Sequence, residues 1–315
     1  MLSRTAENLY WITRHMERAE TAARLYSVGA RNALLPSEAG GHRNEWEAVL
    51  RASGGADAYA AKYGEPVQRH IETHLVLDLD NPGSVAACIA RARENARIVR
   101  TALTGQTWNA LSEAHAEMTA MRRTARSRLD AEDIVDRVTR MAASVRGAIE
   151  STQLRGDGFD FMRLGYLLER MDGTARLLDV KYFVLLPQAN MVGSGVDNAQ
   201  WGTVLRALSS HGAFTWAYGG PPDAMRIVEF LVLHPDCPRG LSPCAGGATW
   251  QLERLCRRYG NSGLALARAR GLRAELIEAR VADVFEEGLH EFLLRMQREV
   301  GALSAAIASD YFGGT

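Results

Sequence analysis

The sequence reads Glu17-Arg18-Ala19-Glu20-Thr21-Ala22-Ala23-Arg24-Leu25-Tyr26-Ser27-Val28 near its start and Glu169-Arg170-Met171-Asp172-Gly173-Thr174-Ala175-Arg176-Leu177-Leu178-Asp179-Val180 near its middle. In a gapless alignment that begins with Leu9 against Phe161, six residues of the first stretch recur, and Glu20 returns as Asp172. Unrelated segments would share only about one residue in such a window, so the match indicates an internal repeat.

Two further blocks return in the same order, and they pair Trp46–Ala52 with Trp201–Ala207 and Leu75–Pro82 with Leu231–Pro238. Three matched blocks in one order are explained most economically by a tandem duplication. We therefore predict a single domain over residues 1–315 that consists of two repeat halves, 1–152 and 153–315.

Apolar residues recur at spacings of three and four in the opening segment of each half, which is the period of a helix with one buried face. These seam residues are Leu9, Ile12, Met16, Ala19, Ala23, Tyr26, Ala30 and Ala33 in the first half and Phe161, Leu164, Leu168, Met171, Ala175 and Leu178 in the second. Two such seams bury each other most simply across a pseudo-twofold axis. The sequence predicts an all-α helical bundle built from two tandem pseudo-symmetric repeats, with a long last helix over residues 272–309.

The composition excludes several functional classes. Lys plus Arg and Asp plus Glu number 37 each, so no net field favours nucleic acid or an anionic membrane. No apolar run approaches the roughly 20 residues that a membrane helix needs. The four cysteines show no C-x-x-C spacing, which leaves no zinc ribbon or dithiol motif. We expect a cytoplasmic protein that requires no cofactor, and a homo-oligomer is compatible with the sequence.

The repeated polar residues fall on one stripe of each opening helix. At 100° per residue, Glu17, Glu20 and Arg24 lie within about 60° of one another beside the apolar seam. The second half repeats this arrangement. If the two helices pack on their seams, the carboxylates and arginines converge at one spot near the middle of the molecule, with Arg18 and Arg170 flanking. The residues that converge are Glu17, Glu20, Arg24, Glu169, Asp172 and Arg176.

Three interpretations of this cluster stay open at the level of sequence. A partly buried ion network would fix how the halves register. Facing arginines would clamp a carboxylate or phosphate while the acids orient them. A two-metal carboxylate site is the third, but no Glu-x-x-His motif accompanies the acids, so we predict no metal. Glu94 and Arg97, one helical turn apart, are further candidates for the same polar site. No catalytic residue can be assigned.

The sequence resembles the bacterial alpha-E family, a helical domain of unknown function. The resemblance covers essentially the whole chain, and two departures from the family pattern are His15 and the segment Asp236-Cys237-Pro238-Arg239-Gly240. It rests on the segments Met1–Trp11, Glu17–Arg24, Asn81–Val85, Ala92–Arg97 and Leu168–Arg176.

The resemblance implies a genomic context more than a reaction. Proteins of this kind are similar to those encoded beside ATP-grasp ligase-like proteins and transglutaminase-like peptidases. The leading hypothesis is a helical accessory or substrate-binding partner of an ATP-grasp amide or peptide ligase. One alternative is a stand-alone enzyme of peptide or amide metabolism with Glu17 and Glu169 as acid/base groups, and another is a purely structural scaffold. Whether the protein is an enzyme is left undecided.

Overall fold

The computed structural model describes all residues except 35–42, 125–129, 186–194, 221, 261 and 314–315. Every regular element in the described part is a helix, with no strand among these residues, so the predicted all-α class is confirmed. None of the described helices combines the length and the apolar character that a bilayer crossing needs.

The helices follow one another in a similar order before and after residue 156. The first set is α1 (Ser3–Asn32), α2 (Arg43–Ser53), α3 (Ala56–Tyr63), α4 (Gln68–Glu72), the π-helix η1 (Thr73–Leu77), α5 (Val85–Ile98), the 3-10 helix η2 (Arg100–Ala102), α6 (Gly105–Arg123) and α7 (Ala131–Thr152). The second is α8 (Asp157–Leu185), α9 (Gly195–Ala207), α10 (His211–Tyr218), α11 (Ala224–Val228), the π-helix η5 (Glu229–Leu233), α12 (Leu241–Tyr259), α13 (Leu264–Glu278), α14 (Val281–Glu287) and α15 (Leu289–Tyr311). In each set a π-helix directly continues a short α-helix.

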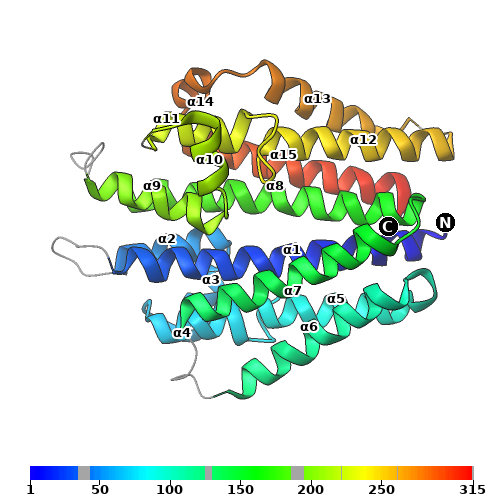
Figure 1. Ribbon diagram of the computed structural model, residues 1–315, viewed down its shortest axis with the longest axis horizontal. Helices are drawn as coiled ribbons and strands as arrows, with labels where there is room; N and C mark the ends of the chain where they lie inside the picture. The colour runs from blue at the N-terminus through cyan, green and yellow to red at the C-terminus, as the bar shows by residue number, and fades with distance from the viewer. Residues whose placement is uncertain (35–42, 125–129, 186–194, 221, 261, 314–315) are drawn as a thin grey trace.

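The helices α1 and α8 run side by side through the centre of the bundle (Figure 1). Helices α5, α6 and α7 lie on one side of this pair, and α12, α13 and α15 lie on the other. Helix α2 packs against α8 as well as α1, and α9 packs against α1 as well as α8. As a result, α1 is buried over residues 12–17 and 19–29, and its charged residues there must find partners inside the protein.

The closest approach of α1 and α8 uses small residues that lie outside the apolar seams. A methyl group on Gly165 would overlap the carbonyl oxygen of Tyr10, and one on Gly173 would overlap the side chain of Thr21. The hydroxyl of Thr13 on α1 donates to the carbonyl oxygen of Met162 on α8 at 2.7 Å. Because these backbones are so close, the polar stripe beside the seams lies in the interface itself.

The prediction of one long helix over residues 272–309 is wrong. The chain forms α13, α14 and α15 there, with breaks at Ala279–Arg280 and at Gly288. The side chain of Asp283 accepts a hydrogen bond from the backbone N–H of Arg280 at 3.0 Å, and this cap begins the new helix α14. Gly288 has a φ of +95°, a conformation that glycine adopts without strain, and it ends α14.

The close approach predicts opposite effects for the same substitution at two glycines. Gly165→Ala should lower the free energy of unfolding by about 1–3 kcal/mol, since its methyl group meets the backbone of α1. Gly147→Ala is the matched control within helix α7, where an added methyl group meets no atom within 4 Å. It should raise the free energy of unfolding by about 0.5–1 kcal/mol. Urea denaturation of both variants measures this, and a shift of the same sign in both would contradict the proposed helix contact.

Candidate functional site

The two Glu-Arg dipeptides exchange partners across the contact of α1 and α8. Arg170 donates its Nε–H to Oε1 of Glu17 at 2.9 Å, and Arg18 donates its Nε–H to Oε1 of Glu169 at 2.5 Å. Each carboxylate therefore binds the arginine of the other helix. The sequence placed Arg18 and Arg170 at the flanks of the cluster, and in the structure each of them pairs directly with a glutamate of the other helix.

Around Glu17 and Glu20 the charged groups form a cluster that the protein itself completes. Glu17 is 1% exposed and Glu20 is fully buried. Arg239, from the loop before α12, donates to Oε1 of Glu17 at 2.9 Å and also to Glu20. Helix α7 brings Arg146 to 3.4 Å from Oε2 of Glu17. We call this set the closed cluster; it comprises Glu17, Glu20, Arg24, Arg146, Arg170 and Arg239.

Backbone carbonyls fix the arginines of the closed cluster. Arg24 donates to Oε1 of Glu20 at 2.5 Å and, with another nitrogen, to the carbonyl oxygen of Ala207 at the end of α9. Arg170 donates to the carbonyl oxygen of Pro238 at 3.2 Å. The hydroxyl of Thr174 donates to the carbonyl oxygen of Arg239 at 2.9 Å, which holds the loop that delivers this arginine.

The second set of charges is only partly buried, because Arg18, Asp172 and Arg176 are partly exposed while Arg14 and Glu169 are buried. Arg14 and Arg18 both bind Glu169, and Arg176 donates its Nε–H to Oδ2 of Asp172 at 2.6 Å. The side chains of Arg18 and Arg176 are 33% and 28% exposed. We call this set the open cluster; it comprises Arg14, Arg18, Glu169, Asp172 and Arg176.

The open cluster forms one wall of a cleft of about 370 Å³. Both central helices contribute to this cleft, together with the end of α2 and the loop before α5. Its lining residues are Arg18, Thr21, Ala22, Leu25, Ser53, Gly54, Gly55, Leu75, Asn81, Pro82, Gly83, Glu169, Asp172 and Arg176. A volume of this size lies in the range that small ligands occupy in proteins.

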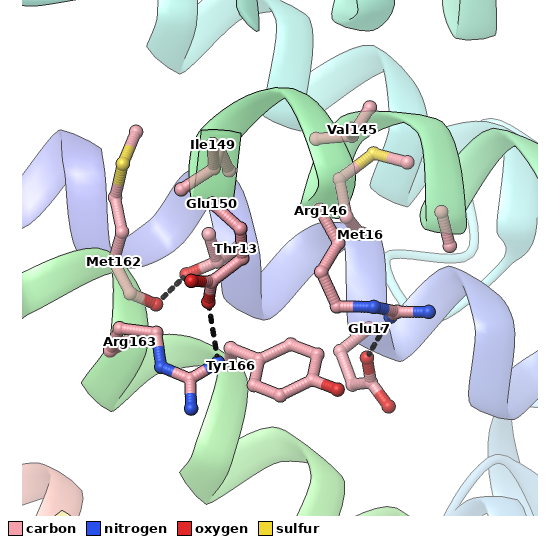
Figure 2. A pocket seen from close by; sticks show the side chains of 11 residues that line it. Thr13, Met16, Glu17, Val145, Arg146, Ile149, Glu150, Met162, Arg163 and Tyr166 are labelled. Carbon is pink, nitrogen blue, oxygen red and sulfur yellow. Dashed lines mark hydrogen bonds and ion pairs between the residues drawn. The ribbon is translucent and has the colours of Figure 1, made fainter. Parts of the chain in front are cut away.

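The closed cluster borders only a small cavity. Figure 2 shows Arg146 pointing at Glu17 beside the ring of Tyr166, with Met16 and Val145 packed next to them. The space between these side chains is about 20 Å³, which is enough for about one water molecule. A molecule much larger than water does not fit in this cavity.

The electrostatics of the buried carboxylates follow from this pairing. Burial alone would raise the pKa of Glu169, but the guanidinium groups of Arg14 and Arg18 outweigh it and hold the pKa well below its usual value. Burial likewise opposes ionisation of Glu20, whose pKa Arg239, Arg24 and Arg146 keep low. Both carboxylates are thus ionised throughout the physiological pH range.

The structure brings the predicted residues to the contact of α1 and α8, but it divides them between two clusters, whereas the sequence predicted one spot. Glu94 and Arg97 do not belong to either cluster. They pair with each other at 2.6 Å on the outside of α5 and are 51% and 61% exposed. Among the described residues, no three His, Cys, Asp or Glu side chains gather closely enough to hold a metal ion.

Sequence reasoning missed Arg14, Arg146 and Arg239. For Arg239 a signal exists, because the register that matches Pro238 with Pro82 places this arginine opposite Gly83. The residue that matches Arg14 in α8 is Tyr166, so a comparison of the two repeats does not mark Arg14 as a repeated residue. Arg146 lies on α7, outside the matched blocks, and only the packing of that helix against α1 reveals its role.

Comparison with known proteins places these observations in a family. A family model described as a predicted alpha-helical domain with a conserved ER motif matches residues 1–312. The dipeptides Glu17-Arg18 and Glu169-Arg170 are two occurrences of such a motif. No curated protein and no solved structure matches the chain.

The depressed pKa of Glu169 predicts a stability difference that depends on pH. Glu169→Gln should lower the free energy of unfolding at pH 7 by about 3 kcal/mol, because Arg14 and Arg18 lose their buried partner. The contribution of an ionised Glu169 is present above its unfolded pKa of about 4.3 and is lost as pH falls through its lower folded value. The difference between native and variant protein should therefore shrink towards pH 3. Urea denaturation at both pH values measures it.

The exposed carboxylate of Glu94 provides the control for this measurement. Glu94→Gln should change stability little at either pH, because solvent screens its pair with Arg97. A difference for Glu169→Gln that is equally large at pH 7 and pH 3 would show that its charge is not what stabilises the fold.

Proposed function

The chain belongs to the Alpha-E family, and from that premise we propose that it is a helical accessory or substrate-binding partner of an ATP-grasp amide or peptide ligase system, with a transglutaminase-like peptidase as a further partner. One observation carries the proposal: a cleft of about 370 Å³ is lined by charged residues of both Glu-Arg stretches. Three of these charged residues, Arg18, Asp172 and Arg176, remain partly exposed in the cleft.

We also infer that the domain is a tandem duplication of one helical unit. The two sets of helices occur in a similar order, and each includes a π-helix. Matching arginines also make matching contacts: Arg24 donates to the carbonyl oxygen of Ala207, and Arg176 donates to that of Ala52 at 3.0 Å. Ala52 and Ala207 are the last residues of the matched tryptophan blocks, so each half uses its arginine to hold a helix end of the other.

The chemistry of the cleft suits recognition of a small polar substrate. Arg18 and Arg176 present partly exposed guanidinium groups, which bind carboxylates or phosphates in a fixed orientation. Asp172 and Glu169 hold these arginines in place. Such a cleft would orient a reacting group of the substrate in an amide ligase system. That group is either the carboxylate to be activated or the amino group to be acylated.

The alternative of a stand-alone enzyme is supported less well. Glu17 and Glu169 are almost fully buried and each is paired with at least two arginines. A general acid or base works best with a pKa near the operating pH, whereas the pKa of Glu169 is held well below that range. A purely structural role accounts for the closed cluster but gives no reason for the cleft.

The two clusters predict different outcomes for the equivalent arginines. Arg24→Met should lower the free energy of unfolding by about 3–5 kcal/mol, since Arg24 is 3% exposed and pairs with the fully buried Glu20. Arg176→Met should cost only about 1 kcal/mol, because its ion pair is partly solvated. The folded Arg176→Met protein should nevertheless lose its effect on ATP-dependent amide formation by the co-purified ATP-grasp protein. Denaturation and the coupled assay, run on both variants, measure this.

Two results would overturn the proposal. One is failure of the native protein to co-purify with the ATP-grasp protein and to change its amide formation. The other is an Arg176→Met variant that is folded and fully active in the coupled assay, because the cleft would then have no part in the function.

A further inference from the structure

Gly83 and Arg239 occupy the same position relative to the helix that follows them. Gly83 is separated from the first residue of α5 by Ser84, and Arg239 is separated from the first residue of α12 by Gly240. Both follow a proline, Pro82 or Pro238, and both of their loops come after a π-helix. The Pro238-Arg239 loop contacts the closed cluster, whereas Pro82 and Gly83 line the cleft beside the open cluster.

Arg239 gives each carboxylate of the closed cluster an additional partner. Oε1 of Glu17 accepts from Arg170 and from Arg239, both at 2.9 Å. Oε1 of Glu20 likewise accepts from Arg24 and Arg239. One guanidinium group thus bridges the two carboxylates, which is the paired geometry that arginine favours.

The corresponding oxygens of the open cluster lack this partner. Oε1 of Glu169 accepts from Arg18 alone, and Oδ2 of Asp172 accepts from Arg176 alone, among the described residues. No described group donates to Oδ1 of Asp172. Glu169 accepts three N–H groups, two from Arg18 and one from Arg14, so the more open acceptor sites are the oxygens of Asp172. Gly83, which has no side chain, lines the same cleft as Glu169 and Asp172.

We propose that the cleft binds the guanidinium group of a small arginine-like ligand, which bridges Glu169 and Asp172 as Arg239 bridges Glu17 and Glu20. This assignment rests on the proposed substrate-binding function and names the substrate class. The source of the group is either free arginine or an arginine side chain of a short peptide.

The neighbouring arginines do not exclude such a cation. Glu17 and Glu20 are flanked by Arg170 and Arg24, which correspond to Arg18 and Arg176, and the closed cluster still accommodates Arg239. The closed cluster thus holds four guanidinium groups around two carboxylates, whereas the open cluster holds three, those of Arg14, Arg18 and Arg176.

The rest of the cleft suits the stem of the same ligand. Apolar groups of Ala22, Leu25, Leu75 and Pro82 line it next to the charged wall. The methylene groups of an arginine side chain pack on surfaces of this kind while the charged end reaches polar partners. A volume of about 370 Å³ leaves room for more of the ligand than its guanidinium group.

Isothermal titration calorimetry with defined probes tests the assignment. The native protein should bind L-arginine, or the tripeptide Gly-Arg-Gly, at least roughly tenfold more tightly than L-citrulline, a neutral analogue of the same shape, because a charged hydrogen bond is lost. Whichever of L-arginine and Gly-Arg-Gly binds more tightly identifies the source of the guanidinium group. Gly83→Arg should abolish binding, since its side chain occupies the same place as the ligand.

Two controls accompany the Gly83→Arg variant. Its fold should be intact, because a Cβ atom at Gly83 meets no atom closer than 3.5 Å, and its thermal midpoint should equal or exceed that of the native protein. Gly212→Arg adds the same charge on α10, outside the cleft and with no atom within 4 Å, and should leave binding of L-arginine unchanged.

Equal affinity for arginine and citrulline, or arginine binding that survives in Gly83→Arg, would overturn the inference. If L-glutamate binds instead and Gly83→Arg blocks it, the guanidinium assignment fails while the substrate-binding function stands. If no probe binds and Gly83→Arg leaves the coupled amide formation unchanged, both fail.

Discussion

The reciprocal exchange between Glu17-Arg18 and Glu169-Arg170 is the constraint on which the architecture depends. Burying a carboxylate is costly unless a cation and hydrogen bonds compensate it, and each of these glutamates finds its cation on the other helix. The exchange is satisfied only at one register and one separation of α1 and α8. Gly165 and Gly173 permit that separation, so the small residues and the charged residues of the two stretches serve the same contact.

Much of this arrangement could be predicted from the sequence, and the limits have physical causes. The helical period of the seams and the repeat of Glu17–Val28 in α8 indicated two central helices and the charged residues between them. Which residues pair with those charges depends on the distance between the two helices. Contacts at glycines set this distance, and the helical period of the sequence does not reveal it. This is why Arg18 and Arg170 were assigned a flanking place.

The cleft was beyond sequence reasoning for a different reason. Gly83 contributes no side chain to its lining, and a motif search gives weight to the residues that are present. Arg239 is visible as an arginine in a loop, but its role appears only when the loop is seen to contact Glu17 and Glu20. Arg146 on α7 has no matched counterpart that would have drawn attention to it.

The two clusters differ in how completely the chain pairs their charges. In the closed cluster the chain supplies every cation, so Glu17 and Glu20 are paired whether or not a ligand is present. That internally satisfied contact keeps α1 and α8 in register. The open cluster lies between the same two helices, and there Glu169 is buried and paired while Asp172, Arg18 and Arg176 stay partly exposed.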